Sequence, residues 1–201
     1  KNVLVENCYF NTGDDCIAIK SGRGADGHRI AVPAENIVIQ GCEMRDGHGG
    51  VVMGSEISGG CKYVFAENLI MDSPNLDRVL RIKTNSVRGG TIENIFLRNI
   101  EVGQVREAIV RVNFYYEEGD AGVHTPIVRN VYLQNIKSNK SKYALYLKGY
   151  ERSPITCFVL EDCSFNGVTN ASILEDYDQF TFSNVFVNNV AINSADELLK
   201  K

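Results

Sequence analysis

The feature that most constrains the fold of this chain is an internal repeat of one short apolar pattern. Each copy has a polar residue, three mostly apolar residues, two polar or small residues and then a residue expected to point inward. The copies begin at Asn2, Asn36, Lys62, Asn94, Asn130, Cys157 and Asn184, between 26 and 36 residues apart. A constant core with insertions of variable length is typical of a solenoid whose loops differ from coil to coil.

The residue types in and around these copies favour strands. The copies are short and rich in β-branched residues, Gly, Asn, Asp and Ser separate them, and no amphipathic helical stretch is expected between residues 1 and 190. We therefore predict an all-β fold, a right-handed parallel β-helix of about seven coils, with residues 1–201 as one domain. Residues 194–201 break the repeat and are expected to form a polar tail, a cap or a short helix.

Stacked coils bring equivalent residues into columns about 4.8 Å apart. One predicted column consists mainly of residues that tolerate left-handed turns and can bond one another, namely Asn7, Gly41, Glu67, Asn99, Asn135, Asp162 and Asn189. The next column is expected to point inward and contains Cys8, Cys42, Asn68, Ile100, Ile136, Cys163 and Val190. Its cysteines are interpreted as small core residues, and a bridge between Cys8 and Cys42 stays open.

A second strand in each coil aligns in the same way. Side chains alternate along a strand, so Arg81 and Lys83 share the outer face. Counting back three places from the first apolar residue of each strand puts Asp14 beside His48, with Asp77 one coil further. Adjacent coils would then present carboxylates, a histidine and an Arg–Lys pair on one surface. The aligned segments are 17–20, 51–54, 80–83, 110–113 and 145–148.

This set of side chains suits the cleavage of a glycosidic bond in an acidic sugar. One carboxyl group donates a proton to the leaving oxygen while another activates water. Carboxylates this close cannot all ionise freely, so one pKa is expected to rise, as a general acid requires. A nearby imidazole can tune that proton or bind substrate, and Arg81 and Lys83 suit an anionic sugar.

Composition excludes several other classes of function. The formal net charge of −4 argues against a nucleic-acid binder held by overall charge and gives no indication of a membrane partner. No apolar run approaches the roughly 20 residues of a transmembrane helix. The six cysteines lack metal-site spacing. We expect a monomer.

Three motifs, Gly13-Asp14-Asp15, Gly47-His48-Gly49 and Arg81-Ile82-Lys83, resemble in order and separation the central motifs of the polygalacturonases of glycoside hydrolase family 28. The resemblance covers nearly the whole chain. It implies a pectin-lyase-like β-helix that hydrolyses α-1,4-linked galacturonan with inversion, needs no metal or other cofactor, and is secreted or periplasmic. Segments 73–77 and 115–120 look more like bacterial members, many of which are exo-acting.

The resemblance also implies a role for each motif residue. Asp14 would be the general acid, Asp15 would help activate the water, and His48 would support the protonation of the acid. Arg81 and Lys83 would hold the carboxylate of the galacturonate beyond the scissile bond.

The family has a tyrosine near the site one coil later, and two residues of this chain compete for that place. They are Tyr115 and Tyr116. Strand parity counted from Arg111 and Asn113 favours Tyr115 as a substrate-binding residue.

One departure concerns a further Asn-Thr-Asp motif, whose Asp is the third catalytic carboxylate of the family and lies about one coil upstream of Gly-Asp-Asp. The chain begins 13 residues before Asp14 and does not contain it. The resemblance therefore implies the C-terminal part of a longer enzyme and leaves open whether this part is active alone. Alternatives are a Ca²⁺-dependent pectate lyase, a non-catalytic carbohydrate-binding solenoid, and a rhamnogalacturonan hydrolase of the same family.

Overall fold

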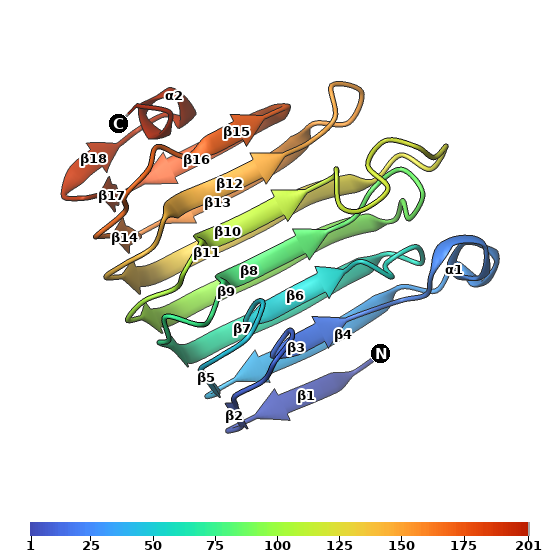
Figure 1. Cartoon of the computed structure of the whole chain (residues 1–201), viewed down its shortest axis with the longest axis horizontal. Coiled ribbons are helices and arrows are strands. Elements are labelled where there is room, and N and C mark those ends of the chain that lie inside the picture. The colour runs from blue at the N-terminus through green and yellow to red at the C-terminus, as the bar shows by residue number, and fades with distance from the viewer. Residues whose placement is uncertain (201) are drawn as a thin grey trace.

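The chain winds into a parallel β-helix, and the computed structural model describes residues 1–200. Successive coils lie side by side, and their strands form two long sheets (Figure 1). The 12-stranded sheet contains β1 (Val3–Glu6), β2 (Tyr9–Phe10), β4 (Ala34–Gln40), β5 (Glu43–Met44), β7 (Cys61–Met71), β9 (Thr91–Val102), β11 (Ile127–Ser138), β13 (Ile155–Glu161), β14 (Ser164–Phe165), β16 (Tyr177–Ser183), β17 (Val185–Val187) and β18 (Val190–Ile192). The 6-stranded sheet contains β3 (Ile17–Ile19), β6 (Val51–Gly54), β8 (Arg78–Lys83), β10 (Ala108–Asn113), β12 (Tyr143–Lys148) and β15 (Ile173–Glu175).

The smaller sheet has the register that the sequence predicts. Ile17 pairs with Val51, Val51 with Leu80, Leu80 with Val110, and Val110 with Leu145. All of these residues except Ile17 are fully buried. The hydrophobic core therefore runs along the inside of the coils, and the polar residues that alternate with the core residues on β8 face outward.

In the larger sheet, the third copy of the repeat begins one residue later than expected. Val64 pairs with Ile37, which shifts the whole copy by one place. The turn column therefore contains Asn68 rather than Glu67, and the inward column contains Leu69 rather than Asn68. Asn68 adopts the left-handed turn with φ 56°, whereas Glu67 stays paired within β7.

The seventh copy also differs from the prediction, because it is formed by residues 179–185 of β16 and the start of β17. Asn184 and Val185 occupy the places expected for Asn189 and Val190. Val190 belongs instead to β18, which turns back and pairs antiparallel with β17. The aromatic pattern of 179–185 satisfies the repeat as well as the later segment does, so spacing alone did not separate the two.

Asparagine side chains form hydrogen-bonded ladders at the turns, as expected. Asn99 Nδ2 donates to Asn68 Oδ1 at 3.2 Å, and Asn135 Nδ2 donates to Asn99 Oδ1 at 2.9 Å. A second ladder joins Asn36 to Asn2 and Asn130 to Asn94. Each of these residues has a positive φ, so the side chain satisfies the turn and links it to the next coil.

Asn99→Ala is expected to lower the free energy of unfolding by about 2 kcal/mol, because alanine loses both ladder bonds and is strained at positive φ. Asn99→Gly should cost about half as much, since glycine adopts the turn freely. Asn139→Ala is the control, at an exposed asparagine without a positive φ. The measurement is denaturant unfolding of the three variants. Equal losses for the alanine and glycine variants of Asn99 would show that backbone strain plays no part.

The cysteines are all free in the structure, and the bridge between Cys8 and Cys42 is not formed. Cys42 and Cys163 are buried in the core, as predicted. Cys8 is exposed instead, because it follows β1, which pairs with β4 alone. Burial raises the pKa of the Cys163 thiol to about 11, so this residue behaves as a core side chain.

Within residues 1–200, two short helices interrupt the all-β pattern. Helix before residue 190 is negligible, as predicted, and is confined to the seven residues of α1 (Gly24–Ile30) in the insertion between β3 and β4. The insertion lies outside the coil core, so the apolar repeat carries no signal for it. Near the end of the chain, α2 (Ala195–Leu198) buries Leu198. Lys201, the last residue of the predicted tail, lies outside the described residues.

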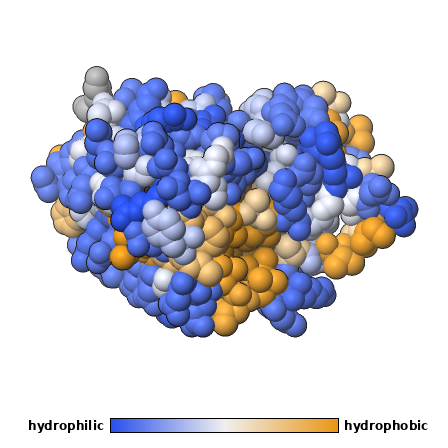
Figure 2. Space-filling model, turned by 60° about the horizontal axis from the view of Figure 1, so that its bottom comes forward, coloured by the Kyte–Doolittle hydropathy of each residue, from blue (hydrophilic) through white to orange (hydrophobic). Residues whose placement is uncertain are grey.

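The end of the solenoid that carries β1 and β3 exposes apolar side chains. Each of these two strands pairs with a single neighbour among the described strands. Val3, Leu4 and Tyr9 are exposed there. Figure 2, in which the bottom of Figure 1 comes forward, shows apolar surface bordered by polar residues.

Candidate active site

Asp14 and His48 lie side by side in the loops before β3 and β6, on adjacent coils. The His48 backbone N–H donates to the Asp14 carbonyl oxygen at 3.0 Å, which holds the two loops in register. His48 Nδ1 lies 3.1 Å from Asp14 Oδ1. The side chains are open to solvent, with 81% of Asp14 and 53% of His48 exposed. The pair predicted by counting along the sequence is therefore formed and is accessible to solvent.

Gly47 allows these loops to approach each other. A Cβ at this position would lie 2.7 Å from the Asp14 carbonyl oxygen and 3.0 Å from Cys16 Sγ, closer than side chains pack. The Thr12 hydroxyl donates to the same carbonyl oxygen at 2.6 Å. The first glycine of the Gly-His-Gly motif thus permits the close approach in which hydrogen bonds hold the backbone of Asp14.

The sequence predicted that the pKa of one of the neighbouring carboxyl groups rises, but the pKa of Asp14, the general acid that the resemblance implies, is lowered. The main cause is the Asp15 backbone N–H, which donates to Asp14 Oδ1 at 2.8 Å, and His48 adds a second stabilising contact. The expectation of a raised pKa required a second carboxylate close by in a dry environment. Asp14 instead faces water in the free protein, where its ionised form is well solvated.

Asp15 points the other way, into a charged cluster beneath the surface. Its side chain is only 5% exposed and meets two cations of β8. Lys83 Nζ lies 2.7 Å from Asp15 Oδ2, and Arg81 donates through one terminal nitrogen to Asp15 Oδ1 at 3.3 Å. Neighbouring carboxylates of one motif therefore have opposite environments, one solvated and one enclosed by cations.

Arg81 and Lys83 are less exposed than the sequence suggested. They project from the outer face of β8, as predicted, but both side chains are largely covered and pair with Asp15. Arginine has five N–H donors and the lysine ammonium has three. Among residues 1–200, no other acceptor binds either side chain by a hydrogen bond. Each cation therefore retains donors for an incoming anion.

The structure places Tyr116, not Tyr115, at the Arg–Lys pair. The Tyr116 ring centroid is 5.7 Å from the Arg81 guanidinium carbon and 5.5 Å from Lys83 Nζ. Tyr115 packs edge-on against Tyr150 instead. Strand parity failed here because β10 ends at Asn113, whose side-chain oxygen accepts the Tyr115 N–H at 3.0 Å and begins a turn. The asparagine at the end of the strand was the sequence signal that could have indicated this turn.

Asp77 is not on the open surface with Asp14, contrary to the sequence interpretation. Its carboxylate is buried between Arg78 and Arg106. Arg78 donates to Asp77 Oδ2 at 3.1 Å and to the His48 carbonyl oxygen at 2.9 Å, and it also pairs with Glu107. Burial lowers the pKa of Arg78 to about 10, which still leaves it charged at neutral pH. The Asp77–Arg78 pair therefore supports the His48 loop. Counting residues along the outer face of the strands could not predict this role.

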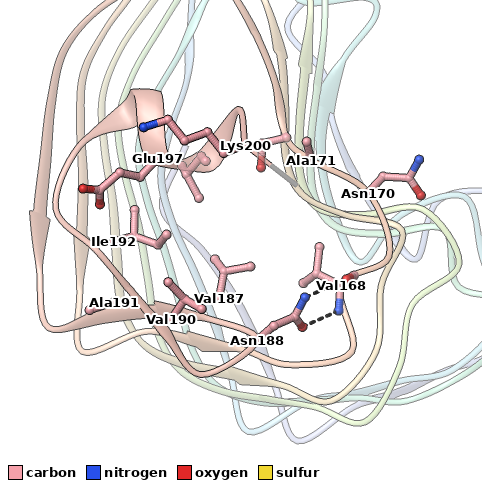
Figure 3. Close-up of a pocket in the computed structure, with 12 residues that line it drawn as sticks. Val168, Asn170, Ala171, Val187, Asn188, Val190, Ala191, Ile192, Glu197 and Lys200 are labelled. Carbon is pink, nitrogen blue, oxygen red and sulfur yellow. Dashed lines mark hydrogen bonds between the residues drawn. The ribbon is translucent and has the colours of Figure 1, made fainter.

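The structure has other hollows, but they do not match these motifs. A cavity of about 440 Å³ at the C-terminal end is lined by apolar side chains such as Val187 and Ile192, with Glu197 as its only acidic group (Figure 3). A lone carboxylate does not provide the acid and base of a hydrolase. Within residues 1–200, no cluster of three potential metal ligands occurs, and none of the helices is long and apolar enough to cross a membrane.

Comparison with known proteins links this arrangement to carbohydrate hydrolases. A probable polygalacturonase of Vitis vinifera is 28% identical over 159 residues, which cover 77% of this chain and 32% of the relative. An exo-poly-alpha-D-galacturonosidase of Dickeya chrysanthemi is 29% identical over 202 residues, covering 92% of this chain and 33% of the relative. A hyperthermoactive exopolygalacturonase from Thermotoga maritima has a solved structure that matches with a TM-score of 0.88 and 39% identity, over 94% of this chain and 42% of that one.

These matches cover most of this chain but less of each relative. The chain spans about a third of the length of the curated relatives and 42% of the Thermotoga structure. The model of glycosyl hydrolases family 28 matches residues 1–188, which include every motif described above. On the strength of that match, the chain belongs to glycosyl hydrolases family 28.

Proposed function

We propose that the protein carrying this chain hydrolyses the α-1,4-galacturonosidic bonds of polygalacturonate. The observation that carries the proposal is the convergence of Asp14, His48 and the Asp15–Arg81–Lys83 cluster on three adjacent coils. The family match and the names of the relatives support the substrate class. A solvated carboxylate beside an enclosed one provides two groups with distinct roles in the same reaction.

Asp14 acts as the general acid in this proposal. A sugar bound over its exposed carboxylate removes water, and loss of water favours the protonated form. His48 Nδ1, which lies 3.1 Å from Asp14 Oδ1, exchanges the proton with Asp14. The same contact orients the Asp14 carboxyl group toward the leaving oxygen. The low pKa that Asp14 has in the free protein therefore has to rise when substrate binds.

Asp15 acts as the base that helps to activate the attacking water. Its carboxylate forms ion pairs with Arg81 and Lys83, which hold it in place as a proton acceptor. The remaining donors of the two cations hold the carboxylate of the neighbouring galacturonate, and Tyr116 packs beside that sugar. Inversion follows if water attacks from the face opposite the leaving oxygen.

The names of the Dickeya and Thermotoga relatives favour exo action, so we include it in the proposal. We also propose a secreted or periplasmic monomer, since polygalacturonate is a polymer that an enzyme would meet outside the cytoplasm.

The proposal is tested by incubating the natural protein that contains this chain with polygalacturonate and measuring reducing ends. We expect steady release that a chelator does not stop, with monogalacturonate as the early product. A methyl-esterified substrate should be cleaved more slowly, because it lacks the charge that Arg81 and Lys83 bind.

Other results would favour the alternatives. Binding without release of reducing ends would indicate a non-catalytic carbohydrate-binding solenoid. A product that absorbs in the ultraviolet and requires Ca²⁺ would indicate a lyase. Faster cleavage of rhamnogalacturonan would assign the site to that polymer.

A further inference from the structure

A buried arginine lies under the loop that carries Tyr116. Arg88 follows β8 and is only 2% exposed. One terminal nitrogen of its guanidinium lies 3.1 Å from Glu117 Oε2 and 3.1 Å from Glu118 Oε1. These glutamates come directly after Tyr116 in the chain. A single enclosed cation thus holds two adjacent acidic residues of the loop.

Neighbouring polar groups hold the same loop at other points. Asn85, which is buried, donates through Nδ2 to the Tyr116 carbonyl oxygen and to Glu118 Oε2, both at 2.7 Å. Asn85 Oδ1 accepts the Arg88 backbone N–H at 2.9 Å, which ties the two anchors together. From the next coil, the buried Tyr150 hydroxyl lies 2.5 Å from the Phe114 carbonyl oxygen.

These contacts connect the Tyr116 loop to the strand that carries the two cations of the site. Arg81 and Lys83 are on β8, and the turn with Asn85 and Arg88 is its direct continuation. One short stretch of chain, residues 78–88, therefore carries both the two cations and the Asn85 and Arg88 contacts to the Tyr116 loop. Glu117 has a positive φ of 49°, which is unfavourable for a residue with a Cβ and needs such support.

We propose that Arg88 is a positioning residue for substrate binding, which holds Tyr116 over Arg81 and Lys83. The inference rests on the proposed function for its consequence in binding, but the contact itself can be tested without activity. Burying a guanidinium is costly, and the Arg88 Nε has no hydrogen-bond partner in the structure. An apolar side chain would fill a purely structural site at lower cost, whereas it could not hold Glu117 and Glu118 together.

The direct test is hydrogen exchange measured by mass spectrometry in Arg88→Met. We expect amides in residues 114–122 to exchange at least about tenfold faster, because the loop opens locally, while β6 exchanges as in the unchanged protein. A double variant, Glu117→Gln with Glu118→Gln, removes the same two ion pairs by changing the more exposed partners. It leaves the buried Arg88 side chain in place. It should give the same local increase even if Arg88→Met fails to fold.

Arg129→Met is the matched control, since the exposed Arg129 forms an ion pair with Glu93 on the larger sheet, outside the measured segment. The exchange of residues 114–122 should not change in this variant. Kinetics on polygalacturonate should show KM raised about 10-fold or more in the Arg88 and glutamate variants, with a smaller effect on kcat.

The positioning role of Arg88 and its effect on substrate binding are contradicted by different results. Unchanged exchange of residues 114–122 in folded Arg88→Met and in the double glutamine variant would overturn the positioning role. Faster exchange with unaltered KM would overturn its link to binding. Absence of any cleavage by the unsubstituted protein would refute the proposed function and leave the exchange result interpretable.

Discussion

Asp14→Asn is expected to lower kcat on polygalacturonate by at least about 100-fold, within the range for removing a general acid. Asparagine keeps the size of the side chain and can accept the Asp15 N–H, but it cannot deliver a proton. The exposed position of Asp14 means that the fold should survive. Steady-state kinetics of the natural protein that contains this chain, with circular dichroism to check folding, gives the measurement.

The pH profile makes this test specific to proton donation. A general acid works in its protonated form, so kcat should fall as the pH rises through the pKa that Asp14 has in the complex. That alkaline limb should be absent from the residual activity of Asp14→Asn. Asp26→Asn, at an exposed aspartate of α1, is the control and should keep both rate and profile. Near-normal turnover in folded Asp14→Asn would remove Asp14 from the role of acid.

Asp15→Asn is expected to reduce both stability and activity, because the Asp15 carboxylate forms ion pairs with two largely covered cations. Removing one partner of a buried ion pair leaves an unpaired charge and costs about 3 kcal/mol or more. The amide still accepts one hydrogen bond from Lys83, which keeps the loss at the lower end of that range. Loss of the base should lower kcat by about 100-fold as well. Denaturant unfolding and steady-state kinetics measure the two effects.

The structure also predicts how a ligand changes the stability of this variant. With Asp15 neutral, Arg81 and Lys83 are left to bind an external carboxylate, so galacturonate should raise Tm more in Asp15→Asn than in the unsubstituted protein. Glu56→Gln, which removes the more exposed pair with Lys20, should cost less than about 1 kcal/mol and give no such gain. An equal rise in Tm for all three proteins would mean that Arg81 and Lys83 do not bind the sugar carboxylate.

The repeat in the sequence was sufficient to predict the β-helix and the stacking of its second strands. An apolar residue every second place must point inward in a strand, and one residue of slip would expose the whole row. That constraint is strong for residues 51–54 and 80–83, whose inward members are fully buried. Because the register was correct, the pairing of Asp14 with His48 followed from counting.

The same reasoning was weaker where the repeat has more than one alignment. Glu67 and Asn68 both suit a polar turn, and residues 179–185 and 184–190 both fit the apolar pattern. Pairing with the neighbouring coil decided between them, because backbone hydrogen bonds are made in one register only. Insertions outside the core, such as the one that forms α1, are under no such periodic constraint.

Sequence alone thus determined which coils meet and which motif residues lie on adjacent strands, because burial of an apolar row sets both. Only the tertiary structure decided where the side chains beyond the strands point. Tyr116 rather than Tyr115 reaches the cations because a turn begins at Asn113, and Asp77 is enclosed because Arg78 and Arg106 surround it. Such contacts depend on loops from several coils, and their geometry has no period that can be read along one chain.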